Sequence, residues 1–256
     1  MILNKIKKYP RIAYIHVPKC GGVSVSDAIF SATYPGWMKA TSFKSEIDLE
    51  ASRVTAEVMS EEMQKIRQIT LCEFLARKKS RYFSGHTSIT TEILDQFATD
   101  WNFVTMLRNP VDRFVSEYTY NTHKRSSWAK NDASIEEYLN LPAAEEAATT
   151  ITRFFTGCNL ASLKKLEINE CVNLAIVNLQ KFAVVGFLHD IDAFQASLGN
   201  HLSISTKLAH KNSSPASKVS NELFDDDSLI SQVKKLSQMD MLVYEKAVSL
   251  FNKNYS

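Results

Sequence analysis

The fold is decided by the stretch Tyr14-Ile15-His16-Val17-Pro18-Lys19-Cys20-Gly21-Gly22-Val23-Ser24. The apolar run over 12–17 predicts a buried strand that ends at Pro18, and two glycines later residues 24–30 predict a helix. The first amides of a helix have no partner within it, and the helix dipole favours negative charge there. Lys19 adds a positive charge at the mouth of the turn. The stretch therefore predicts a binding site for a phosphate-type anion.

The composition is that of an ordinary soluble globular protein. Of 256 residues, 45% are apolar and 23% are charged, and the formal net charge is +2. Because no field of one sign covers the molecule, nucleic-acid binding has no support and an anion site must be a local cluster. A chain of this length can bury the core of one sizeable α/β domain.

The four cysteines lie far apart, at 20, 72, 158 and 171, and include no CxxC pair. Metal-ligand spacing is therefore absent, and a disulfide framework is not expected in a chain this long. Cys20 follows Lys19, a neighbour expected to lower the pKa of its thiol. A catalytic thiol also needs a base nearby, so we expect reduced cysteines without a covalent role.

No stretch is long and apolar enough for a signal peptide or a membrane span. The apolar run behind the basic N-terminus ends after about six residues, whereas a span needs roughly 18 or more. We therefore expect a soluble, cytoplasmic protein that has no membrane span.

Apolar runs predict the strands of one sheet. After the first strand, residues 102–107 and 182–186 read as buried strands, and 81–84 as a short one. Helical patterns separate them, at 24–30, 91–97, 110–118, 135–141, 143–155, 163–180, 190–198 and along 229–251. Strands alternating with helices, without hairpin signals, predict a central parallel sheet flanked by helices. We expect one α/β domain over 1–256, with a helical insert at about 37–80.

A second candidate anion site follows the strand at 102–107, at the sheet edge where such folds bind ligands. Arg108 closes this strand, and Pro110 suits the first position of a helix. Ser116 lies two turns into that helix, on the side facing Arg108. A guanidinium and a hydroxyl suit a second, dianionic phosphate. An alternative is that Arg108 binds a neighbouring carbonyl and Ser116 is a small packing residue.

The first loop is not a nucleotide-triphosphatase motif. That motif, GxxxxGK[ST], places lysine after the glycines, followed directly by a hydroxyl that holds magnesium. Here Lys19 precedes Gly21 and Gly22, and no GxGxxG is present. The loop therefore predicts a phosphate cradle without an obvious metal ligand.

Together the two sites resemble those of sulfotransferases that use 3′-phosphoadenosine 5′-phosphosulfate (PAPS). Pro-Lys-Cys-Gly-Gly-Val-Ser at 18–24 is similar to their 5′-phosphosulfate-binding loop, and Arg-Asn-Pro-Val-Asp-Arg at 108–113, with Ser116, to their 3′-phosphate motif. The first stretch is closest to the branch of Golgi carbohydrate sulfotransferases and their bacterial relatives. Weaker similarities follow in the right order at 84–86, 152–157, 185–186 and 240–251.

The resemblance implies transfer of a sulfuryl group from PAPS to an acceptor hydroxyl, most often on a carbohydrate, with no metal. Lys19 would stabilise the leaving oxygen by electrostatics. The residues implied in donor binding are Lys19, Cys20, Gly21, Gly22, Val23, Ser24, Arg108, Ser116, Lys211 and Asn212. Val23 departs from the usual threonine, which removes one hydroxyl contact with the phosphate.

His86 is the residue to which the resemblance assigns the general base, and a histidine pKa near 6.5 suits this task. His16 competes, but its place in the first strand predicts a core position. Glu117 is a further candidate base, although a surface position on its helix explains it as well. Arg153 is implied as a contact for an anionic acceptor.

Two other classes stay open. A metal-dependent phosphotransferase using the same loop would need a hydroxyl that holds magnesium and an acidic partner. A non-catalytic nucleotide-binding protein is favoured by Val23. Magnesium-dependent ATP binding would indicate the first class, and nucleotide binding without transfer would indicate the second.

Overall fold

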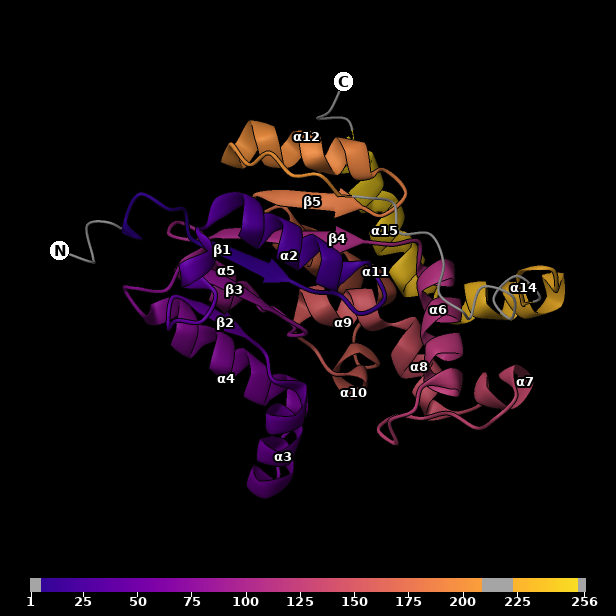
Figure 1. Cartoon of the computed structure of the whole chain (residues 1–256). Coiled ribbons are helices and arrows are strands. Elements are labelled where there is room, and N and C mark those ends of the chain that lie inside the picture. Colours follow the sequence, from indigo (N-terminus) through magenta and orange to yellow (C-terminus); the bar gives the residue numbers. More distant parts are fainter. Residues whose placement is uncertain (1–5, 209–222, 253–256) are drawn as a thin grey trace.

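The computed structural model describes residues 6–208 and 223–252, and a five-stranded sheet lies at its centre (Figure 1). All neighbouring strands pair in parallel, in the order β2-β3-β1-β4-β5. The strands are β1 (Ile12–Ile15), β2 (Lys44–Glu46), β3 (Tyr82–Gly85), β4 (Asn102–Leu107) and β5 (Val184–Phe187). The predicted α/β class with a central parallel sheet is confirmed.

Helices cover both faces of the sheet, with α2 crossing its near face in Figure 1. Within the described ranges, no helix is long and apolar enough to cross a membrane. The helices are α2 (Gly22–Thr33), the 3-10 turn η1 (Gly36–Met38), α3 (Leu49–Met59), α4 (Met63–Ala76), α5 (Thr91–Phe97), α6 (Pro110–His123), α7 (Ile135–Tyr138), α8 (Pro142–Ala148), α9 (Thr150–Thr156), α10 (Leu160–Leu163), α11 (Ile168–Leu179), α12 (Ile191–Leu202), α14 (Asp227–Leu236) and α15 (Gln238–Phe251).

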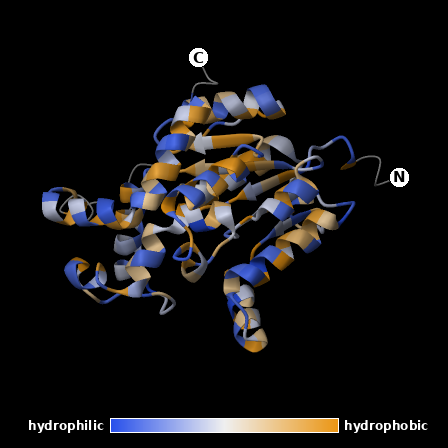
Figure 2. Ribbon diagram, turned by 180° about the vertical axis from the view of Figure 1, so that it is seen from behind, coloured by the Kyte–Doolittle hydropathy of each residue, from blue (hydrophilic) through white to orange (hydrophobic). Residues whose placement is uncertain are grey.

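Strands β1 and β5 are apolar along their whole length because both of their faces are buried. Every residue of β1 and β5 is buried, and Figure 2 shows the sheet as the most hydrophobic part of the ribbon. A second, smaller cluster of buried side chains joins α6, α7, α8 and α14 beside the sheet. Helix α6 follows β4 in the chain and contributes Val111, Phe114 and Tyr118 to this cluster.

The strand register brings the carboxyl ends of the strands to one edge. Ile15 of β1 pairs with Gly85 of β3 and with Thr105 of β4, and Leu107 of β4 pairs with Phe187 of β5. The chain leaves β1 toward β2 and β3 on one side, and leaves β4 toward β5 on the other. The crevice between β1 and β4 is therefore the topological switch point, where such sheets bind ligands.

The sequence predicted a helical insert at about 37–80, but the segment also contains a strand. Its residues Lys44–Glu46 form β2, which pairs with β3 at the edge of the sheet. This strand is polar and only partly buried, so it carries none of the apolar signal that revealed the inner strands. Short, charged edge strands are a common way to protect a sheet from pairing with other chains.

The helix predicted over 143–155 is two helices, α8 and α9, separated at Thr149. The buried carboxylate of Asp240, on α15, accepts hydrogen bonds from the amides of Ile151 and Thr152, each at 2.8 Å. It thereby satisfies amides at the start of α9, which have no partner within the helix. The segments predicted at 163–180 and 229–251 are likewise each divided into two helices.

Candidate active site

The loop between β1 and α2 forms an open cradle of amides. Lys19 and Gly21 both have left-handed backbone conformations, with φ of 66° and 77°, and a lysine in that region is strained. Gly21 caps α2 without a side-chain hydrogen bond. In the described part of the chain, the amides of residues 22–24 find no acceptor. They are therefore available to an anion.

Gly22 packs directly against the ring of His16. A Cβ atom built on Gly22 would lie 1.6 Å from Nε2 of His16, so no other residue fits without displacing the ring. His16 lies just beyond the end of β1 and is half-buried beneath the loop. The predicted core position of His16 is therefore wrong, because the residue belongs to the loop region and not to the strand.

Lys19 lies over an aromatic ring and makes no ion pair among the residues described. Its Nζ is 3.9 Å from the centroid of Tyr120, an exposed side chain of α6. Burial lowers the pKa of Lys19, and Arg108 and Lys124 act in the same direction against Glu117. A bound anion would act against this lowering, because an opposite charge nearby favours the charged ammonium form of Lys19.

Arg108 joins the two predicted anion sites. It follows β4 directly, and its Nη1 donates to the carbonyl of Lys19 at 3.4 Å. The loop after β1 and the end of β4 therefore meet at the switch point, as predicted. No hydrogen bond links Arg108 to Ser116, which is half-buried on α6, so the part of Ser116 in phosphate binding stays a prediction.

His86, directly after β3, packs against His16 with the two rings tilted by 34°. The ring centroids are 4.0 Å apart, and Nδ1 of His86 lies 2.8 Å from the carbonyl oxygen of His16. Because a carbonyl only accepts, Nδ1 carries the proton and Nε2 of the neutral ring is left as a base. Burial is the main cause that lowers both pKa values, that of His16 to about 3. Both rings are therefore uncharged at neutral pH.

Cys20 does not have the lowered pKa that its neighbour suggested. The side chain is fully buried, and burial raises the pKa of the thiol to about 12. The amide of Cys20 donates to the carbonyl of Val17 at 3.4 Å. Cys20 therefore fills space beneath the loop and is not a thiolate.

One face of α6 carries a charged row that sequence analysis did not connect to the site. Arg113 is fully buried, forms an ion pair with Glu117 and donates to the carbonyl of Ala147. Burial opposes its charge, but Glu117 and Asp240 outweigh burial and raise the pKa of Arg113. Glu117 is thus a half-buried partner within the site, not a surface residue.

The spacing of this row was available in the sequence. Positions 113, 117, 120 and 124 follow each other at intervals of four, three and four, which is one face of a helix. The spacing did not reveal which residues of other segments contact this face. Tyr120, for example, contacts the ammonium group of Lys19.

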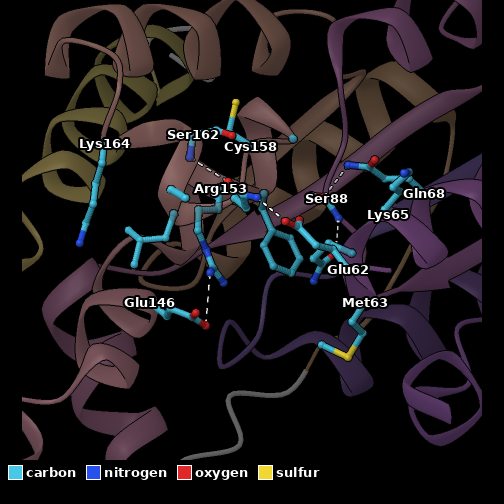
Figure 3. Close-up of a pocket in the computed structure, with 16 residues that line it drawn as sticks. Glu62, Met63, Lys65, Gln68, Ser88, Glu146, Arg153, Cys158, Ser162 and Lys164 are labelled. Carbon is cyan, nitrogen blue, oxygen red and sulfur yellow. Dashed lines mark hydrogen bonds and ion pairs between the residues drawn. The ribbon is translucent and has the colours of Figure 1, made fainter. Parts of the chain in front are cut away.

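The remaining predicted residues lie in different places. Val23 and Ser24 are exposed on the first turn of α2. Arg153 lies on α9, forms an ion pair with Glu146 at 3.4 Å and lines a separate cavity (Figure 3). Lys211 and Asn212 lie outside the described residues.

A cavity of about 560 Å³ adjoins Arg108. Its lining includes Leu188, His189 and Tyr244 from the end of β5 and from α15. The hydroxyl of Tyr244 and Nδ1 of His189 are 2.9 Å apart. Leu188 also borders the loop, since its Cδ1 would lie 3.0 Å from a Cβ on Gly21. The cavity therefore opens beside both candidate phosphate positions.

A parallel sheet flanked by helices, with an open helix N-terminus and an arginine at its switch point, defines the chain as an α/β protein with a candidate anion site. Comparison with family models places the chain more closely. A model of the sulfotransferase family matches residues 5–172, which is more than half of the sequence, and the chain therefore belongs to that family. No curated protein matches the chain. The family indicates sulfuryl transfer as the general activity.

Proposed function

We propose that the protein transfers a sulfuryl group from PAPS to a hydroxyl group, and that the acceptor is a carbohydrate. The observation that carries this proposal is the meeting of two anion sites at the switch point. The open amides of residues 22–24 and the side chain of Arg108 lie on two adjacent loops, joined by the bond from Arg108 to the Lys19 carbonyl. PAPS carries two phosphate groups that need two such sites.

In this proposal, the amides at the start of α2 hold the 5′-phosphate, and Arg108 with Ser116 holds the 3′-phosphate. Val23 contributes its amide but no hydroxyl, and loss of one such hydrogen bond weakens binding by about 0.5–1.5 kcal/mol. The adenine ring occupies the cavity beside Arg108, where Tyr244 and His189 supply aromatic surface. These two side chains lie beyond the segment that matches the family.

The reaction needs one bond to form and one to break. The acceptor oxygen forms a bond to sulfur while the bond between sulfur and the bridging oxygen of the phosphate breaks. The electron pair stays on that oxygen, which leaves with adenosine bisphosphate. Lys19 stands at the mouth of the loop and stabilises this developing charge, as electrostatic groups do in phosphoryl transfer.

His86 takes the proton of the acceptor hydroxyl. Its Nδ1–H is held by the carbonyl of His16, so Nε2 is the atom that accepts. Because burial lowers the pKa of His86, the imidazole is in its basic form at neutral pH. Sulfur transfer and proton transfer together give a sulfate ester, adenosine bisphosphate and a protonated His86.

The proposal is tested by incubating the full chain with PAPS that carries a radiolabelled sulfuryl group and a panel of oligosaccharides, in EDTA. Labelled saccharide is expected without added metal. Transfer that requires magnesium and ATP would indicate a phosphotransferase instead. Tight binding of adenosine 3′,5′-bisphosphate without transfer to any acceptor in the panel would indicate a nucleotide-binding protein.

A further inference from the structure

A second cavity, of about 800 Å³, shares no lining residue with the cavity beside Arg108 (Figure 3). Ser88, two residues after His86, lines it. Arg67 donates to the carbonyl of His86 at 3.1 Å, and its neighbours on α4 form one wall of the cavity. The opposite wall comes from α8, α9 and α10. The segment that carries the proposed base therefore borders the cavity through Ser88.

Every cation that lines this cavity is already paired with a carboxylate. Figure 3 shows Arg153 directed toward Glu146, and the two are 3.4 Å apart. Lys65 pairs with Glu61 at 2.9 Å and Lys164 with Glu145 at 2.6 Å. The positive charge at this surface is therefore neutralised by the protein itself.

One carboxylate of the lining has no cation. Glu62 accepts a hydrogen bond from the side-chain amide of Asn159, and within the described ranges it takes part in no ion pair. An anionic ligand would have to displace the existing ion pairs and approach Glu62 and Glu146. The negative charge of such a ligand would be repelled by these two carboxylates.

The cavity also presents neutral groups that suit hydroxyls. Gln68 donates to the hydroxyl of Ser88 at 2.8 Å, and Gln64 accepts from the Ser88 amide at 2.9 Å. The other halves of these two amide groups have no partner within the described residues. Nε of Arg153 is buried and likewise lacks a partner there. A hydroxyl oxygen satisfies such a donor without bringing a charge.

We infer that this cavity binds the acceptor and that the acceptor is an uncharged, polyhydroxylated saccharide rather than a sulfated or uronic-acid-containing one. This inference rests on the proposed function, because the cavity is assigned to the acceptor through Ser88, which lies two residues after the proposed base His86. It also changes the expected role of Arg153. The ion pair with Glu146 makes Arg153 a hydrogen-bond donor to neutral groups and not a receptor for an anion.

The test compares two ligands that differ at C6 of the sugar, which carries a neutral hydroxymethyl group in one and a carboxylate in the other. Galactose oligomers and galacturonate oligomers of equal length are titrated into the full chain by calorimetry, with and without adenosine 3′,5′-bisphosphate. The neutral series is expected to bind at least tenfold more tightly. Tighter binding of galacturonate, or binding of neither series, would overturn the inference.

The variant Glu146→Gln releases Arg153 from its ion pair. It is expected to improve galacturonate binding at least threefold while galactose binding changes little. Glu73→Gln is the matched control, because it removes the same charge from an exposed ion pair with Arg77 on α4, outside the cavity. An equal gain in both variants would overturn the inference. If Glu146→Gln does not fold, Glu62→Gln carries the same expectation.

The bisphosphate titration separates this inference from the proposed function. Neutral-saccharide preference in a protein that does not bind the bisphosphate contradicts the donor assignment and supports the cavity assignment. Bisphosphate binding without a preference for the neutral saccharide supports the donor assignment and contradicts the cavity assignment.

Discussion

Two regions differ in how their cations are held. The proposed donor crevice is formed by the loop after β1 and Arg108. The proposed acceptor cavity is the one lined by Lys65, Arg153 and Lys164. In the donor crevice, Lys19 lies over the ring of Tyr120 and Arg108 binds a peptide carbonyl, and neither takes part in an ion pair within the described residues. In the acceptor cavity, Arg153 and the two lysines each have a carboxylate within 3.4 Å.

This difference indicates which kind of ligand suits each region. A cation without a carboxylate partner keeps its charge for a ligand, and burial strengthens the attraction because water screens it less. The charge of a cation that is already paired is offset by its own carboxylate, so it attracts a further anion less strongly. The same residue types therefore indicate an anionic donor in one region and a neutral acceptor in the other.

The largest expected effect comes from removing the charge of Lys19. Lys19→Ala is expected to lower kcat about 100-fold, the size of loss found when one electrostatic stabiliser of a transition state is removed. The measurement is steady-state kinetics with PAPS. Lys124→Ala is the control, because Lys124 also faces the ring of Tyr120, at 5.7 Å, but has no proposed part in transfer. A similar loss in both variants would contradict the role of Lys19.

The two uncharged histidines, His16 and His86, should make the fold sensitive to acid. The pKa of His16 is about 3 in the folded protein against about 6.5 when unfolded, so the unfolded chain binds more protons between these values. Stability is therefore full above pH 6.5 and falls as pH decreases, by up to about 2 kcal/mol at pH 5. Chemical denaturation of wild type and His16→Asn measures this. An equal pH slope in both would count against the buried, neutral histidine.

Removing the proposed base should affect turnover but not donor binding. His86→Ala is expected to lower kcat at least tenfold while affinity for the bisphosphate is kept. In the wild type, activity should rise with pH through a pKa below 6.5, because the base must lose its proton and burial lowers that pKa. It should fall again through a pKa below 10.5, where Lys19 loses its charge.

His123→Ala provides the control, since His123 lies at the C-terminal end of α6 and its ring bonds to the carbonyl of Thr119 within that helix. Full activity of His86→Ala would place the base elsewhere.

The smallest expected effect concerns the proposed contact between the first turn of α2 and the 5′-phosphate. Val23→Thr adds a hydroxyl to the exposed first turn of α2, beside the open amides. One further hydrogen bond to the 5′-phosphate is worth about 0.5–1.5 kcal/mol, which is about a two- to tenfold gain in affinity for PAPS. Calorimetry of the variant measures it. Unchanged affinity would mean that the phosphate does not lie at this turn.

Much of the donor crevice could be predicted because its signals are local in the sequence. The apolar runs of β1 and β4, the break at Pro18 and the order of Lys19 and the glycines placed two loops at the same sheet edge. Edge strand β2 could not be found, because a polar three-residue strand is specified by its neighbour β3 and not by its own pattern.

The acceptor side was less predictable, because its properties depend on contacts between distant segments. The start of α9 is fixed by Asp240 of α15, a partner that no local capping pattern indicates. The motif around Arg153 suggested an anion receptor, and only the packing of α8 against α9 reveals its pairing with Glu146. The charge of Arg153 in the sequence therefore pointed to a candidate site but did not show whether its ligand is charged or neutral.

The central claim is that Arg108 and the loop after β1 bind two phosphates of one nucleotide. Calorimetry of wild type and Arg108→Ala with adenosine 3′,5′-bisphosphate and with adenosine 5′-monophosphate tests it most directly. The wild type should bind the bisphosphate at least tenfold more tightly than the monophosphate, and Arg108→Ala should remove that difference while keeping the monophosphate affinity. Equal affinity of the wild type for both nucleotides, or an unchanged preference in the variant, would contradict the claim.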